Sequence, residues 1–80
     1  MVEAGTTEKG DVRVIIEEGP REIVVKSKLE RIYGEAIRRT VEEVTAGLEA
    51  KITVEDLGAL DWVIRARLEA ALRKFRGEEE

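Results

Sequence analysis

The stretch REIVVKSKLERIYGEAIRRTVEEVTAGLEAKITVE, residues 21–55, decides the fold of this chain, because its pattern changes from strand to helix and back to strand. Residues 21–26 are rich in β-branched side chains, and residues 51–55 alternate between apolar and polar ones, as strands do. Between them, apolar residues recur at spacings of three and four, which predicts an amphipathic helix that ends near Ala46 with Gly47 as its cap. We expect a right-handed crossover that lays the helix on one face of a sheet.

The start of this helix carries the S-x-x-E spacing of a capping box at Ser27 and Glu30. Gly34 interrupts the helical pattern and costs ~1 kcal/mol relative to Ala, which indicates a close contact or a local bend. The stripe expected to face the core comprises Leu29, Ile32, Tyr33, Ala36, Ile37, Thr40, Val41, Val44 and Leu48.

Upstream of this unit, residues 11–17 alternate as a further strand, and the break at Gly19 and Pro20 places it at hairpin distance from the strand at 21–26. Ile15 gives it an apolar residue on its second face, so we expect it at the centre of a three-stranded sheet with strand order 2-1-3. The far face of that sheet is expected to meet solvent through Arg13, Glu17, Lys51, Thr53 and Glu55.

Downstream, residues 59–76 repeat the helical pattern, and Gly77 closes the helix. Two amphipathic helices and one sheet need a shared core, so both helices should cover the same face. The predicted fold is therefore α+β, a two-layer ββαβα sandwich in one domain. It consists of a mobile leader (1–10), a folded core (11–76) and an acidic tail (77–80).

The composition excludes several classes of chemistry. The 80 residues include no Cys and no His, which excludes disulfides, Cys-ligated zinc and His-assisted nucleophilic catalysis. A net charge of −4 argues against binding to nucleic acid, and no apolar run approaches the ~20 residues of a membrane span. We expect a cytoplasmic or recombinant protein with no metal site.

Asn and Gln are also absent, while charged residues make up 40% of the chain. This bias is typical of a hyperthermophile protein or of a designed, stability-optimised sequence. Composition alone does not choose between these two origins.

Carboxylates are plentiful, and the pairs Glu42 with Glu43 and Glu55 with Asp56 raise the question of acid-base work or a cation site. Catalytic pairs need different environments to separate their pKa values. These residues fall on expected exposed faces or turns, which favours a solvated surface.

Four arginines and one tryptophan on the two helices have two interpretations each. Arg38, Arg39, Arg65 and Arg67 would bind an anion together, or would form ordinary salt bridges with nearby Glu, which we favour. Trp62 lies off the main stripe of its helix, where it is either peripheral core, the favoured interpretation, or a partner-docking residue.

Three stretches resemble the acyl carrier protein, or gamma subunit, of citrate lyase. Residues 4–11, AGTTEKGD, are similar to the family leader A-G-T-x-E-S-[SG]-D. Residues 58–71, GALDWVIRARLEAA, are similar to K-G-A-L-D-C-x-[IL]-[RK]-A-R-[LV], and residues 33–38, YGEAIR, more loosely to F-G-x-x-I-R. The resemblance covers about residues 4–72, and the malonate decarboxylase carrier subunit is a related, weaker match.

The resemblance implies a carrier rather than an enzyme. In that family a leader Ser is linked by a phosphodiester to a phosphoribosyl-dephospho-coenzyme A arm. The thiol of the arm carries acetyl or citryl groups between two larger catalytic subunits. A mobile leader on a rigid domain would let the arm reach both sites at high effective concentration. The expected partners are therefore citrate lyase catalytic subunits.

One departure from the family pattern concerns the attachment position itself. Lys9, followed by Gly10 and Asp11, stands where the family has its attachment Ser, and an ammonium group has no hydroxyl for the phosphodiester. Thr6 and Thr7 have hydroxyls nearby, but attachment there would shift its register. In the later stretch, the family Cys is replaced by Trp62.

We therefore expect a carrier domain without its cofactor that keeps the family fold. The alternative is a sequence redesigned for stability on this backbone, with no biochemical function.

Overall fold

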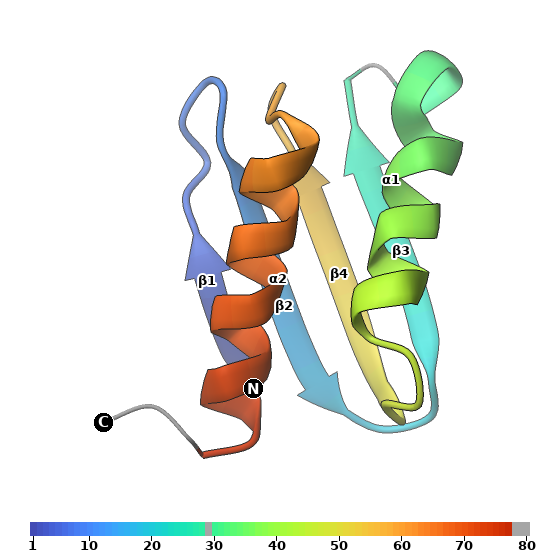
Figure 1. Ribbon diagram of the computed structural model, residues 1–80, viewed down its shortest axis with the longest axis vertical. Helices are drawn as coiled ribbons and strands as arrows, with labels where there is room; N and C mark the ends of the chain where they lie inside the picture. Colours follow the sequence, from blue (N-terminus) through green and yellow to red (C-terminus); the bar gives the residue numbers. More distant parts are fainter. Residues whose placement is uncertain (29, 78–80) are drawn as a thin grey trace.

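The computed structural model describes residues 1–28 and 30–77, with the side chain of Glu30 left out. The elements follow in the order β1 (Val2–Gly5), β2 (Val12–Glu18), β3 (Glu22–Ser27), α1 (Glu30–Val44), β4 (Ala50–Asp56) and α2 (Asp61–Phe75). One mixed sheet carries both helices on the same face, as Figure 1 shows. The α+β class and the shared helical face are confirmed, and β2, β3 and β4 each lie within one residue of the predicted ranges.

The predicted three-stranded sheet with order 2-1-3 is wrong, because the sheet has four strands in the order β1-β2-β4-β3. The strand at 50–56 pairs antiparallel with β2 and parallel with β3, and so lies between them. Its side chains explain this position, since five of its seven residues are buried. Apolar residues on both faces of β2 correctly indicated an interior strand, but its neighbours are β1 and β4.

The predicted mobile leader is also wrong over residues 2–5, which form the edge strand β1. This strand pairs antiparallel with β2, with Val2 opposite Ile16 and Ala4 opposite Val14. Ala4 is buried in the core and Val2 packs against it. Four residues are too few for alternation to be recognised in a sequence, and only the pairing partner makes this segment a strand.

The connection between β2 and β3 explains why these strands do not form a hairpin. Within it, Arg21 donates hydrogen bonds to the carbonyl oxygens of Thr45, at 2.8 Å, and Leu48, at 2.7 Å. These two residues belong to the segment between α1 and β4, so Arg21 holds the connection across the end of the sheet where β4 begins. Pro20 donates no ladder hydrogen bond there. The chain thus passes β4 before β3 begins, in agreement with the strand order.

The core lies between the sheet and the two helices, with α2 on β1 and β2, and α1 on β3. Its buried apolar side chains are Ala4, Val12, Val14, Ile16, Val25, Ile37, Val41, Ala50, Ile52, Val54, Ile64, Leu68, Ala71 and Leu72. The stripe predicted for α1 is wrong at Ile32, Tyr33 and Ala36, which are exposed, and its first member, Leu29, lies outside the described residues. Gly34 is buried within the uninterrupted helix.

The helix ends follow the glycine signals. Gly47 (φ 82°) follows the last turn of α1, and Gly77 (φ 75°) follows α2, both in the left-handed region that glycine favours. The capping box depends on the Glu30 side chain, and the acidic residues of the predicted tail (77–80) are residues 78–80, so both predictions fall outside the described residues.

The far face of the sheet carries an alternating set of charges. Arg13 contacts Glu3 at 2.9 Å and Glu55 at 3.5 Å. Thr53 does not meet solvent as predicted, because it is only 9% exposed between its cross-strand neighbours Ile15 and Val24. Apolar neighbours on both sides therefore cover the middle of this face, although no helix does.

Neither of the two helices resembles a membrane span. Each has 15 residues, whereas a span needs about 20 that are mostly apolar. Among the described residues, no helix is long and apolar enough to cross a bilayer.

Candidate functional site: the loop end of the sheet

Three connections gather at one end of the sheet. Figure 1 shows the β1–β2 loop, the β3–α1 connection and the β4–α2 loop at this end. Gly10 N–H donates to the carbonyl of Leu57 at 2.7 Å, and Leu57 N–H donates to the carbonyl of Asp11 at 3.0 Å. The β1–β2 loop, which belongs to the predicted mobile leader, is therefore fixed to the β4–α2 loop. We call this region the loop end.

Asp11 is the central polar residue of the β1–β2 loop. Its carboxylate accepts hydrogen bonds from the Thr6 hydroxyl at 2.6 Å and from Val12 N–H at 2.7 Å. It also accepts two from the Arg67 guanidinium, at 3.1 and 2.9 Å. The Arg67 pair, followed by the Thr6 and Val12 hydrogen bonds, holds the pKa of Asp11 well below its usual range. The ionised carboxylate therefore joins the loop to α2.

Gly5 allows the loop to begin where it does. Its φ is 88°, and a Cβ on it would lie 1.8 Å from the carbonyl oxygen of Val12 and 3.3 Å from Cδ of Arg67. No other residue fits this close approach without moving backbone. Gly5 of the AGTTEKGD leader is thus required by the close approach of its backbone to Val12.

The candidate residues Lys9, Gly10 and Asp11 lie together on this loop. Lys9 is exposed, and its side chain makes no hydrogen bond or ion pair with the described part of the chain. Gly10 has a φ of 85° and is also exposed. The β1–β2 loop thus presents Lys9 to solvent on a backbone held from both sides.

Asp56 is a structural residue of the loop end that the sequence interpretation placed on an exposed face or turn. It is only 6% exposed. One carboxylate oxygen accepts from Gly58 N–H at 3.2 Å and Ala59 N–H at 2.9 Å, and the other accepts from the Ser27 hydroxyl at 3.1 Å. An Asp two residues before a Gly is typical of such a turn, and this signal was available in the sequence.

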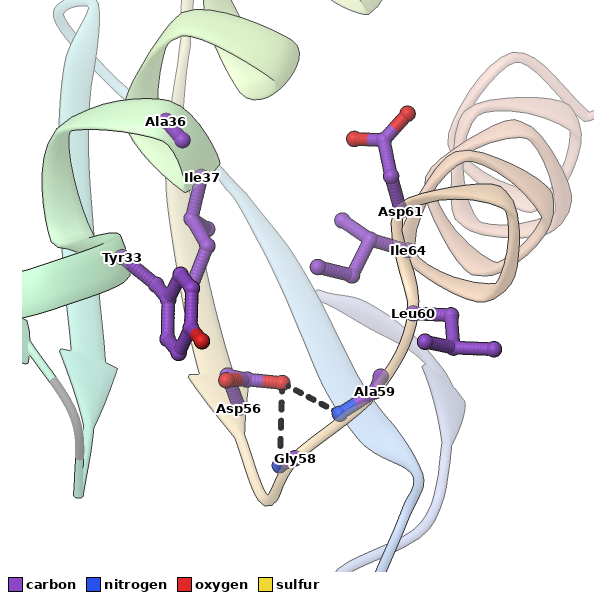
Figure 2. Close-up of a pocket in the computed structure, with 9 residues that line it drawn as sticks. All are labelled: Tyr33, Ala36, Ile37, Asp56, Gly58, Ala59, Leu60, Asp61 and Ile64. Atoms are coloured by element: carbon purple, nitrogen blue, oxygen red, sulfur yellow. Dashed lines mark hydrogen bonds between the residues drawn. The ribbon is translucent and has the colours of Figure 1, made fainter.

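An apolar pocket of about 440 Å³ lies between the two helices beside the loop end. Figure 2 shows Tyr33 and Ile37 of α1 on one side, and Leu60 and Ile64 on the other, with Asp56 between them. Tyr33 is 50% exposed and Leu60 64% exposed. The pocket is therefore open, and two of the apolar side chains that border it, Tyr33 and Leu60, are largely exposed to solvent.

Trp62 lies close by in sequence, near the start of α2. Its exposed fraction is 70%, so the favoured interpretation as peripheral core is wrong. The reason is its position on the helix. The buried residues of α2 are Ile64, Leu68, Ala71 and Leu72, and residue 62 falls on the opposite side.

The four helical arginines do not form one anion site. Arg39 contacts Glu35 at 3.7 Å, and Arg65 contacts Glu43 at 3.1 Å, so the predicted salt bridges are confirmed for these two. Arg38 instead donates to the carbonyl of Ile23 at 3.0 Å, and Arg67 pairs with Asp11.

Asp61 connects the two helices at the start of α2. It accepts from the Thr40 hydroxyl of α1 at 2.7 Å and from Arg65 Nε at 2.7 Å. Arg65 first, and then Thr40, lowers the pKa of Asp61. The same ion pair, together with Glu43, raises the pKa of Arg65. These groups hold the helices together, and their hydrogen-bonding atoms already have partners within the protein.

Metal-ligating side chains do not cluster in the parts of the chain that the structure describes, where no group of three or more Asp or Glu is placed to hold an ion. The loop end thus consists of an exposed loop, held by backbone hydrogen bonds, beside an apolar pocket.

Comparison with known proteins identifies the family of this chain. The sequence model described as "ACP: Malonate decarboxylase delta subunit (MdcD)" matches residues 1–75. The citrate lyase acyl carrier protein of Vibrio cholerae serotype O1 (strain O395) is 43% identical over 77 residues, covering 89% of this chain and 79% of the relative. This chain belongs to the citrate lyase acyl carrier protein family.

Other members of the carrier protein family agree. That of Serratia proteamaculans (strain 568) is 44% identical over 77 residues, covering 89% of this chain and 76% of the relative. The fold is shared with a chain in the crystal structure of a Pseudomonas malonate decarboxylase hetero-tetramer in complex with malonate. That match has a TM-score of 0.78 at 24% identity and covers 91% of this chain and 80% of the other.

The two stretches with the more specific resemblance to the carrier protein family meet in space. Asp11 closes the leader stretch, Arg67 belongs to the α2 stretch, and the two are joined by a pair of hydrogen bonds across 56 positions of sequence. Sequence analysis identified both stretches but not this contact. The leader stretch at residues 4–11 is therefore joined to α2 by these two hydrogen bonds.

Proposed function

We propose that this chain is the carrier-type small subunit of a citrate lyase-like complex, and that it does not carry the family arm at position 9. The observation that supports this is the placement of Lys9 on an exposed, anchored loop at the position where the family resemblance implies the attachment Ser. A phosphodiester needs an oxygen from the protein, and the Lys9 ammonium has none. The residue present therefore does not fit the phosphoribosyl-dephospho-coenzyme A arm.

The neighbouring threonines are poor substitutes for an attachment Ser. The Thr6 hydroxyl donates to Asp11 at 2.6 Å and accepts from Glu8 N–H at 3.2 Å, so modification would break both contacts. Thr7 is exposed, but it precedes Lys9 by two residues, and an arm would leave the loop from a different point. We infer that neither threonine replaces the Ser.

Restoring the hydroxyl tests this proposal. The Lys9→Ser variant, incubated with the transferase that modifies relatives in this family, should gain the mass of one arm, as measured by intact mass spectrometry. The unchanged chain should gain none, and Lys9→Ala serves as the matched control. Mass added to the unchanged chain, followed by its loss in Thr7→Ala, would contradict the inference.

The partners we propose are the larger catalytic subunits of a citrate lyase-like complex, with the chain monomeric when alone. Leu60 and Tyr33 are exposed at the pocket of the loop end, and Trp62 is exposed near the start of α2. Trp and Tyr are enriched among the residues that contribute most to binding at interface centres. Co-purification with tagged catalytic subunits should retain the chain. The Trp62→Ala variant should weaken retention, while Arg76→Ala, at the far end of α2, should not.

The alternative is a stability-optimised sequence on this backbone with no biochemical function. It is favoured by the absence of Asn, Gln, His and Cys, and by the replacement of the family Ser and Cys by Lys9 and Trp62. It predicts no retention by catalytic subunits at micromolar concentration, and no modification of Lys9→Ser. If the catalytic subunits retain the chain but Lys9→Ser gains no arm, docking is supported. Only the capacity to carry the arm has then been lost.

A further inference from the structure

Three lysines gather around two adjoining hollows at the loop end. Lys9 and Lys28 line a hollow of about 470 Å³, and Lys26 and Lys28 line a second of about 370 Å³. The two hollows share Thr7, Ser27, Lys28, Asp56 and Leu57. Side chains from the β1–β2 loop, the end of β3 and the β4–α2 loop thus surround one continuous concave surface.

The ammonium groups of Lys9, Lys26 and Lys28 are not neutralised by contacts. None of them makes a hydrogen bond or ion pair with residues in the described ranges, whereas Arg67 and Lys74 do. The carboxylates that line the hollows have other partners. Asp56 accepts its three hydrogen bonds from Ser27, Gly58 and Ala59. Glu55 forms an ion pair with Arg13 at 3.5 Å, although its buried Oε1 accepts no hydrogen bond from the described residues.

Three cations that form no ion pair with the described residues line one concave surface and attract an anion, even on a chain with a net charge of −4. Lysine ammonium groups bind phosphate oxygens as point charges, and an exposed hydroxyl such as that of Thr7 donates to the same oxygens. Two hollows that share one wall suit two linked phosphates. We propose that the loop end binds a phosphate-bearing ligand non-covalently, with a diphosphate bridging Lys9, Lys28 and Lys26.

This inference is independent of the carrier function. It depends on the lining of the hollows and not on any partner subunit or modifying enzyme. If it fails, the co-purification and mass measurements are unaffected, and their failure does not affect it.

The test is a titration of the full chain with inorganic pyrophosphate, followed through backbone amide NMR shifts at constant ionic strength. We expect saturable shifts at residues 7, 9, 28, 57 and 58. The Lys9→Ala/Lys28→Ala double variant should bind at least about tenfold more weakly, since each lost charge-assisted contact is worth about that factor. Lys51→Ala removes the same charge at the other end of β4 and should bind within about twofold of the unchanged chain.

A parallel titration with adenosine diphosphate identifies the source of the phosphates. Tighter binding than pyrophosphate would support a nucleotide, and equal binding would support a phosphate group alone. Shifts that do not saturate by about 10 mM, the range of very weak association, would overturn the proposal. Equal weakening by Lys51→Ala would also overturn it, since that result indicates general charge attraction.

Discussion

The apolar core and the loop end are stabilised by different forces. The core between sheet and helices consists of aliphatic side chains such as Val14, Ile52 and Leu68, all fully buried. The loop end is instead held by two carboxylates, Asp11 and Asp56, which accept hydrogen bonds from backbone amides, hydroxyls and Arg67. The stabilisation from burying apolar area does not depend on pH, whereas the stabilisation from an ionised carboxylate does. The fold and the position of its functional loop should therefore respond differently to the same treatment.

This difference also separates two kinds of substitution. A core residue should change the stability of the whole domain, and a loop-end residue should change where Lys9 is presented with less effect on the rest. The following experiments compare the two regions, from the largest expected effect to the smallest.

The largest effect is expected in the core. Leu68→Ala removes a fully buried side chain of α2 that packs with the sheet, and should lower the free energy of unfolding by about 4 kcal/mol through lost burial and a cavity. Urea denaturation monitored by circular dichroism measures this, and the loss should be the same at pH 7 and pH 4. Ala66→Ser, on the exposed side of the same helix, should change stability by less than about 0.5 kcal/mol.

A somewhat smaller effect is expected where the loop leaves the sheet. Gly5→Ala places a Cβ against the Val12 carbonyl in a left-handed conformation, which should cost about 3 kcal/mol. The Arg67–Asp11 contact should loosen as well, visible as amide NMR shifts across residues 5–12. Gly10→Ala also has a positive φ but no atom within 4 Å of the new Cβ, so it should cost about 1 kcal/mol. Equal losses in the two variants would contradict the steric explanation.

The third effect should depend on pH. The folded-state pKa of Asp11 is lowered, so its ionised form stabilises the fold above the unfolded value of about 3.9. That stabilisation is lost as the pH falls through the folded pKa. Asp11→Asn should therefore be less stable than the unchanged chain at pH 7, and the difference should shrink progressively below about pH 5. Melting temperatures between pH 7 and pH 2 measure this.

A matched control for Asp11→Asn is Glu69→Gln. Glu69 is an exposed carboxylate of α2 that contacts no charged group among the described residues. Its variant should have the stability of the unchanged chain at every pH. A constant difference between Asp11→Asn and the unchanged chain down to pH 2 would mean that hydrogen-bond shape, not charge, holds the loop.

The smallest effect concerns the sheet edges. Lys74 donates to the Glu3 carbonyl of β1 at 3.0 Å, and Arg38 donates to the Ile23 carbonyl of β3 at 3.0 Å. Each helix thus occupies a backbone acceptor of an edge strand, which is one way to oppose edge-to-edge association. The Lys74→Ala/Arg38→Ala variant should lose less than about 1 kcal/mol of stability but form larger species in light scattering. An unchanged particle size would contradict this role.

Local patterns in the sequence predicted both helices and the three longer strands, because each buries one face and its period is therefore visible. Patterns failed where a segment becomes regular only through its partner. Residues 2–5 become a strand by pairing with β2. Tyr33 is exposed because the first turn of α1 lies outside the core. At the loop end the sequence singled out Lys9 and Asp11 by resemblance. It did not identify the Arg67 contact or the buried state of Asp56.

The sequence alone determined the element types, the charged surface, the missing chemistries and the family, since each is carried by residue identity or short-range spacing. The tertiary structure decided the order of the strands, the fixed position of the leader and the grouping of Lys9, Lys26 and Lys28. These depend on contacts between distant segments. Arg21 reaches Leu48 across 27 positions and Arg67 reaches Asp11 across 56, and no local pattern encodes which partner a side chain finds once the chain has closed around its core.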